Sequence, residues 1–247
     1  MPINPLLVVL GLATLFAGGF MQGLSGFGFA LIGVPVLSLF MSPKVAAPIV
    51  VTCVLVSNLL VLYNARHNVQ FKRIWPLGVA GMLGVPVGAW LLHDLSVDAL
   101  RLLMGGVVTV AAILMALGVR VAIKRERLAF LPVGFSSGML SGSIGIGGPP
   151  VILFFTNQQL PPKVFRANIV AYFTILNVAT NTVFISSGVI TEEVLRYTLL
   201  FLPGLFAGVF VGTRLTNKVP DLLFRRIALA LVIGTGVVSI LKGLGAV

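Results

Sequence analysis

Residues 138–150 of this chain read Gly-Met-Leu-Ser-Gly-Ser-Ile-Gly-Ile-Gly-Gly-Pro-Pro and join two apolar segments, 128–142 and 144–157. A helix needs about 20 residues to cross the roughly 30 Å of hydrocarbon in a membrane, and both segments are shorter. Glycine permits unusual backbone conformations, and proline ends a helix because it lacks an N–H group. At membrane depth, such irregular backbone survives only inside protein or beside a water cavity. In a membrane protein, the stretch therefore predicts a broken or re-entrant helical hairpin.

The composition of the whole chain indicates a membrane protein. Of its 247 residues, 58% are hydrophobic and 9% are charged, and the mean hydropathy is +1.10. A soluble domain carries about 25% charged residues, so this chain could not cover its surface in water. We expect an all-α polytopic membrane protein and exclude a soluble enzyme and a nucleic-acid binder. Breaks in hydropathy delimit ten segments, at residues 5–22, 25–40, 46–63, 74–92, 99–119, 128–142, 144–157, 167–186, 196–213 and 226–244.

The charged residues gather in loops between these segments. Seventeen Lys and Arg residues against six Asp and Glu residues give a net charge of +11. Cytoplasmic loops of membrane proteins are enriched in Lys and Arg. This rule puts the basic loops 64–73, 119–127, 158–166 and 214–226 in the cytoplasm, and the acidic loops 93–98 and 187–196 outside. Both chain termini are then predicted outside. Lys44 and Lys242 also fall outside, against the rule.

The chain contains an internal repeat. The matches are Leu24-Ser25-Gly26 with Leu140-Ser141-Gly142, 116 positions later; Pro43-Lys44-Val45 with Pro162-Lys163-Val164 and Asn58 with Asn177, 119 positions later; and Gly84 and Gly88 with Gly208 and Gly212, 124 positions later. Because each repeat holds five segments, an odd number, we expect residues 5–119 and 128–244 to form two inverted repeats within a single membrane domain. Inverted repeats are typical of secondary transporters, whose sites lie near mid-membrane between the repeats.

The first two segments of repeat 1 meet at residues 18–28, which are as rich in glycine as residues 138–150. Two such breaks facing each other would direct helix N-termini at a central ligand, and helix N-termini attract anions. Close packing through small residues is the competing interpretation, and we favour it for the spaced glycine pairs of the repeat, such as Gly84 and Gly88. The candidate substrate-binding residues are Gln22, Ser25, Gly26, Asn58, Ser141, Gly142, Gly147, Gly148, Asn177, Asn181 and Arg166.

No carboxylate lies within any apolar segment, which argues against a buried proton relay and against a cationic substrate. Cys53 is the single cysteine, and His67 and His93 each stand alone, so we expect no metal site, no cofactor and no enzymatic centre. An anion that leaves a cell with a negative interior gains about 2.3 kcal/mol per charge per 100 mV. Export of a small anion would therefore need no coupled ion.

The Leu-Ser-Gly breaks, the Gly145-Ile146-Gly147-Gly148-Pro149 stretch, the Pro-Pro-Lys loop and the duplicated layout resemble the sulfite exporter TauE/SafE family over about residues 10–244. The resemblance implies a bacterial inner-membrane permease for sulfite, sulfonates such as sulfoacetate, or related organic anions. We expect export by alternating access, with a small anion and the lipid bilayer as partners, and a monomer or homodimer. Proton-coupled uptake of organic anions is one alternative, and a membrane scaffold that transports nothing is another.

Overall fold

The computed structural model describes residues 5–117, 126–158, 160–215 and 233–245, and these residues form helices and no strand. The elements are α1 (Pro5–Ser25), α2 (Phe29–Leu37), α3 (Pro43–Ala65), the short 3-10 helix η1 (Arg66–Asn68), α4 (Phe71–Asp94), α5 (Val97–Ala116), α6 (Glu126–Ile144), α7 (Gly148–Asn157), α8 (Pro162–Ser186) and α9 (Glu192–Leu215), followed by the apolar helix Ile233–Gly243. Parts of the predicted loops 119–127 and 214–226 and of the segment 226–244 lie outside the described residues.

Six of these helices are long and apolar enough to cross a membrane, namely α1, α3, α4, α5, α8 and α9. The chain is therefore a multi-pass, all-helical membrane protein, as the composition predicts. The outer surface of α4 carries Trp75 and Trp90, which are 60% and 61% exposed. At 1.5 Å per residue the two indoles lie about 22 Å apart along the helix. Tryptophan prefers the two membrane–water interfaces, so this spacing fits a helix that crosses the bilayer.

The two backbone breaks are shorter than the sequence predicts. Helices α1 and α6 continue to Ser25 and Ile144, so only Gly26–Gly28 and Gly145–Gly147 interrupt the helices. Gly26, Gly28 and Gly145 have φ angles of 84°, 97° and 72°, in the region that favours glycine. The glycines before each break are helical instead, which corrects our expectation for residues 18–25 and 138–144. Beyond the breaks, α2 and α7 have only 9 and 10 residues.

The helical glycines allow two pairs of helices to touch backbone to backbone. A Cβ atom on Gly84 of α4 would lie 2.2 Å from the carbonyl oxygen of Phe135 in α6. A Cβ atom on Gly208 of α9 would lie at the same distance from the carbonyl oxygen of Phe16 in α1. Small residues permit this close approach, which increases dispersion attraction between helices in a membrane. The packing interpretation of these spaced glycines is confirmed.

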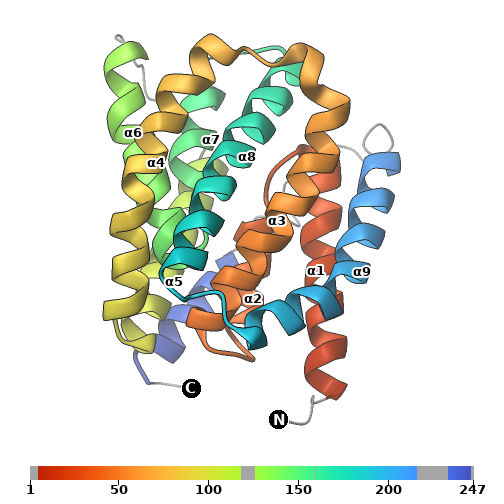
Figure 1. The fold of residues 1–247 in the computed structure, drawn as a ribbon, viewed down its shortest axis with the longest axis vertical. Coiled ribbons are helices and arrows are strands. Elements are labelled where there is room, and N and C mark those ends of the chain that lie inside the picture. The colour runs from red at the N-terminus through yellow and green to blue at the C-terminus, as the bar shows by residue number, and fades with distance from the viewer. Residues whose placement is uncertain (1–4, 118–125, 159, 216–232, 246–247) are drawn as a thin grey trace.

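Helices α3 and α8 pack against each other in the middle of the molecule. In Figure 1 the α4–α6 pair stands on one side of them and the α1–α9 pair on the other. Helix α4 also packs on α8, and α9 also packs on α3. The short helices α2 and α7 contact α3 and α8 respectively, so both breaks are held against the two central helices.

One end of the molecule gathers the starts of α4, α6 and α8 and the end of α7. Gln158 Nε2 donates to Glu126 Oε1 at 3.0 Å, and Arg73 Nε lies 3.6 Å from the same Glu126 oxygen. The backbone N–H of Gln70 donates to Asn168 Oδ1 at 2.8 Å. The residue after α7 thus contacts the first residue of α6. Described parts of the basic loops 64–73, 119–127 and 158–166 share this end.

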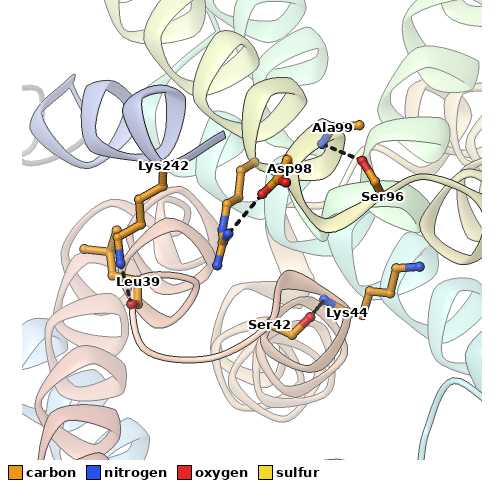
Figure 2. Close-up of polar contacts among 8 residues, drawn as sticks. Leu39, Ser42, Lys44, Ser96, Asp98, Ala99 and Lys242 are labelled. Atoms are coloured by element: carbon orange, nitrogen blue, oxygen red, sulfur yellow. Dashed lines mark hydrogen bonds and ion pairs between the residues drawn. The ribbon is translucent and has the colours of Figure 1, made fainter. Parts of the chain in front are cut away.

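The two lysines that violate the loop-charge rule lie at the opposite end of the molecule. Lys44 Nζ donates to the carbonyl oxygen of His93, in the last turn of α4, at 2.8 Å. Lys242 Nζ donates to the carbonyl oxygen of Leu39, just after α2, at 3.0 Å (Figure 2). Cations stabilise the carbonyl ends of helices. Both lysines therefore have a structural role that explains their position independently of topology.

The contact between α4 and α6 yields the first prediction. A Cβ atom on Gly138 would lie 1.9 Å from the carbonyl oxygen of Gly81, and backbone cannot move aside as a flexible side chain can. We expect Gly138→Val to destabilise the protein by about 3 kcal/mol or more. Size-exclusion chromatography and the midpoint of thermal unfolding in detergent would measure the effect.

Gly106→Ala is the matched control for Gly138→Val. Apart from the backbone of α5 itself, no described residue places a heavy atom within 4 Å of a Cβ atom on Gly106 in that helix. Alanine is favoured over glycine in a helix by about 1 kcal/mol, so the unfolding midpoint should stay or rise. A Gly138→Val protein with the wild-type midpoint would contradict the packing interpretation.

Candidate functional site

A small central pocket lies where the two helix breaks approach each other. Its volume is about 30 Å³, which is the space of one water molecule. Residues of α1, α2, α3, α6, α7 and α8 line it, together with Phe27, Gly28 and Gly145–Gly147 of the breaks. The apolar part of the wall includes Val54, Phe173 and Leu176. Segments more than 100 residues apart in the chain thus share one cavity.

Part of the predicted site gathers at this pocket and part of it does not. The candidate residues that line it are Gln22, Ser141, Gly147, Gly148 and Asn177. The candidates outside its wall are Ser25, Gly26, Asn58, Gly142, Asn181 and Arg166. The pocket therefore unites side chains from α1, α6 and α8 with the break before α7.

The first turns of α2 and α7 both reach the pocket. Phe29, Ala30 and Leu31 line it from α2, and Gly148 lines it from α7. The N-cap residues of both helices, Gly28 and Gly147, have no side chain that could bond the N-terminal N–H groups. The first N–H groups of a helix have no partner within the helix, and they carry partial positive charge. The pocket is thus the meeting point of two helix N-termini.

The two helix N-termini are unequal in hydrogen-bond donors. Pro149 and Pro150 follow Gly148 in the first turn of α7, and proline has no backbone N–H. The corresponding residues of α2 are Ala30 and Leu31, which keep their N–H groups. The α2 side of the pocket therefore offers more backbone donors than the α7 side.

Two asparagine side chains add polar groups near the pocket. Asn177 lines it and is 6% exposed, and its side chain makes no hydrogen bond to another described residue. Asn58 is fully buried, accepts a hydrogen bond on Oδ1 from Gln22 Nε2, and leaves its own Nδ2 without a partner in the described structure. A buried donor without a partner costs about 1–3 kcal/mol. Both amides can therefore form an additional hydrogen bond to a ligand or to water.

Ser141, which lines the pocket, forms a hydroxyl pair with Thr180, which is not among the lining residues. Ser141 Oγ lies 3.0 Å from Thr180 Oγ1, and Thr180 Oγ1 donates to the carbonyl oxygen of Leu176 at 2.9 Å. Because a hydroxyl has one proton, Ser141 is the donor of the pair. Our list of candidates omits Thr180. Its position three residues after Asn177 on α8 places it on the same helix face, which is the signal that could have found it.

Ser25 and Asn181 make structural hydrogen bonds. Ser25 Oγ donates to the carbonyl oxygen of Phe27 at 2.6 Å, across the first break. Asn181 Oδ1 accepts from Thr52 Oγ1 at 2.7 Å, which links α8 to α3. Their partners identify these side chains as supports of the break and of the central helix pair.

Two further candidates, Gly142 and Gly26, pack against neighbouring elements. A Cβ atom on Gly142 would lie 2.4 Å from the carbonyl oxygen of Val85 in α4, so Gly142 belongs to the α4–α6 contact. A Cβ atom on Gly26 would lie 2.6 Å from Cγ of Arg166. Arg166 Nη2 donates to the carbonyl oxygen of Gly23 at 2.9 Å. Arg166 thus ties the start of α8 to the end of α1.

Arg166 also lines a second, larger cavity of about 900 Å³ between α3, α8 and α9. Lys163, one turn earlier on α8, lies on the same wall. Neither this cavity nor the central pocket has a carboxylate among its described lining residues. In the described parts of the chain, no three His, Cys, Asp or Glu side chains cluster in a way that could hold a metal ion.

The sequence is similar to known membrane transporters. The family model of the sulfite exporter TauE/SafE matches residues 10–239. A protein of Cupriavidus necator named "probable sulfite/organosulfonate exporter TauE" is 28% identical over 98% of this chain and 97% of its own length. The "probable membrane transporter protein YdhB" of Bacillus subtilis is 27% identical over 64% of this chain and 68% of its own. No solved structure matches the chain significantly.

The buried pair of Gln22 and Asn58 yields the second prediction. Asn58→Leu leaves Gln22 Nε2 without its acceptor, and we expect a cost of about 1–3 kcal/mol in stability. The double variant Gln22→Leu/Asn58→Leu removes both partners and should lose less than the sum of the two single changes, by about 0.5 kcal/mol or more. Thermal unfolding of the four proteins in detergent measures this coupling. Strictly additive losses would contradict the hydrogen bond.

Proposed function

Because this chain belongs to the sulfite exporter TauE/SafE family, we propose that it moves small sulfur-containing or organic anions across the cell membrane through the central pocket. The family and both relatives are membrane transporters, so the protein is a transporter and not an enzyme. The name of the Cupriavidus necator relative supports sulfite and organosulfonates as substrates. One observation supports the pocket most strongly: two helix N-termini and the unpaired amide of Asn177 meet there.

The chemistry of the pocket suits an anion. Each helix N-terminus stabilises a nearby negative charge by about 0.3–1 kcal/mol, and by up to about 2 kcal/mol in partly buried sites. The amide of Asn177 and the backbone N–H groups of α2 can donate hydrogen bonds to sulfonate oxygens. No carboxylate of the described lining residues opposes the charge. The oxygens of sulfite or of a sulfonate group could therefore accept hydrogen bonds from these N–H groups.

The pocket is too small for the proposed substrate in this conformation. A space of about 30 Å³ holds one water molecule and not a sulfur atom with three oxygens. Transport therefore requires the two hairpins, α1–α2 and α6–α7, to move relative to the central helices. We propose alternating access, in which each hairpin in turn opens the pocket toward one side of the membrane.

The pairing of the helices supports the proposed inverted repeats. The first helix of each half packs against the fourth helix of the other half, since α1 contacts α9 and α6 contacts α4. The third helices of both halves, α3 and α8, contact each other. Gly26 and Gly145, 119 positions apart, both have positive φ and both begin a break. A two-fold axis between α3 and α8 would produce this exchange of partners.

We propose that the end with the basic loops faces the cytoplasm and that both termini lie outside. Described basic residues of that end include Arg73 and Lys163, and the lysines of the opposite end bond helix carbonyls. An inside-negative potential drives anions outward. Proton-coupled uptake and a scaffold without transport remain the alternatives, and the flux measurements below separate them.

The third prediction concerns Asn177. We expect Asn177→Leu to abolish saturable flux of labelled sulfite and sulfoacetate into proteoliposomes, because it removes the unpaired amide from the pocket. Thr182→Val on the same helix is the matched control, since the Thr182 hydroxyl is exposed and bonds only its own helix. Both variants must purify as folded protein. Equal flux through Asn177→Leu and wild type would exclude the pocket as the substrate site.

The fourth prediction concerns the driving force. At 100 mV, each negative charge moved contributes about 2.3 kcal/mol, which corresponds to a distribution ratio of about 50-fold. We expect an imposed membrane potential, without a pH gradient, to drive the labelled anion toward the positive side. Flux that follows a pH gradient and ignores the potential would favour proton-coupled uptake. Absence of flux for every anion tested, with folded protein, would favour the scaffold.

A further inference from the structure

The cavity between α3, α8 and α9 has the features of a second anion site. Its volume of about 900 Å³ is far larger than that of the central pocket. The cations Lys163 and Arg166 stand on the α8 wall. The three ion pairs found in the described residues involve other arginines, so neither cation has a carboxylate partner there. The positive charge of this cavity is therefore available to an anionic ligand.

The remaining described lining residues of this cavity are mostly apolar, with Asn68 and Thr213 as uncharged polar residues among them. Helix α3 contributes Leu60 and Val61, and helix α9 contributes Phe206 and Phe210. A bound ligand is stabilised by about 25 cal/mol for each Å² of apolar surface that it removes from water. A bare inorganic anion would leave this surface uncovered. A ligand with a charged head and an apolar substituent would use both kinds of wall.

The cavity also adjoins the central pocket through Arg166. The guanidinium donates to the carbonyl oxygen of Gly23, and Gln22, the preceding residue, lines the central pocket. The stem of Arg166 lies against Gly26 of the first break. Only Nη2 of Arg166 bonds Gly23, and a guanidinium has five N–H groups, so an anion can bind the others directly beside the contact that ties α8 to the α1–α2 hairpin.

The matching position in the other half of the chain carries no charge. Ala47 lies 119 positions before Arg166, and its Cβ would lie 3.2 Å from a Cβ atom on Gly145 of the second break. One break thus packs against a methyl group and the other against an arginine. The charged contact occurs only at the end of the molecule that carries the basic loops.

We propose that this cavity captures organosulfonates before they reach the central pocket: the sulfonate binds Arg166 and Lys163, and the organic substituent binds the apolar walls of α3 and α9. This inference rests on the proposed function and narrows its substrate class. Sulfonates with an apolar substituent bind the cavity more tightly than sulfite does. Affinity rises with the length of the substituent until the cavity is filled.

Binding of the n-alkanesulfonates from methanesulfonate to hexanesulfonate tests the proposal. Isothermal titration uses the purified full-length protein in phosphatidylcholine nanodiscs. We expect the dissociation constant to fall about threefold to fourfold per added methylene group, which is the fold-change for burying one methylene. Phe206→Ser should flatten this dependence, while Leu199→Ser, an exposed position of the same helix outside the cavity, should preserve it.

Charge variants test the head-group site separately. Arg166→Gln should weaken binding of every sulfonate by about tenfold or more, as expected for loss of a charged hydrogen bond. Lys163→Gln, at an exposed position, should weaken sulfonate binding about threefold. It tests the head-group site if the Arg166 variant does not fold. Arg196→Gln is the control, because Arg196 lies at the other end of the molecule in an ion pair with Glu192.

Several outcomes would overturn the proposal. Affinity that is independent of chain length, with normal flux of sulfite, would exclude this cavity and leave the central pocket as the transport site. Loss of alkanesulfonate binding when the nanodiscs contain phosphatidylglycerol would assign the cavity to the phosphate of an anionic lipid. Loss of both binding and flux for every anion would instead refute the proposed function itself.

Discussion

Backbone contact between helices at glycine is the constraint on which the rest of this structure depends. At Gly84 and Gly138 the α4–α6 contact leaves no room for a Cβ atom, and the same holds at Gly208 between α9 and α1. These contacts hold α1 and α6 in place. The short helices α2 and α7 begin inside the molecule, where protein rather than lipid surrounds their N-termini.

This arrangement places polar groups at the centre of an apolar protein without burying a carboxylate among them. Ser141 and Thr180 bond each other, Gln22 bonds Asn58, and Asn177 faces the pocket. Uncharged groups cost less to bury than charges do, and they can exchange partners when a ligand arrives. A charged residue does lie beside these groups: Arg166 is half-buried at the first break and bonded to a carbonyl oxygen. Its charge distinguishes the two ends of an otherwise similar architecture.

Much of the fold could be predicted because its signals are local. Hydropathy marked the helices, and Gly26 and Gly145 fell inside stretches expected to break. The predicted extent of the breaks was wrong, because the sequence does not show whether a glycine interrupts a helix or lets two helices pack closely. Residues 138–144 are helical because α4 packs against them, and α4 lies more than 40 residues earlier in the chain.

The sequence by itself determined that the chain lies in a membrane, that it is helical, and where its helices are interrupted, because composition, hydropathy and Gly-Pro content act over short stretches. Only the tertiary structure decided which polar residues share a pocket. Gln22 and Asn177 line one cavity while Arg166 lines another, and this depends on how each helix is rotated and which helix it meets. Those choices follow from contacts between distant segments, such as Arg166 with Gly23, which no local pattern records.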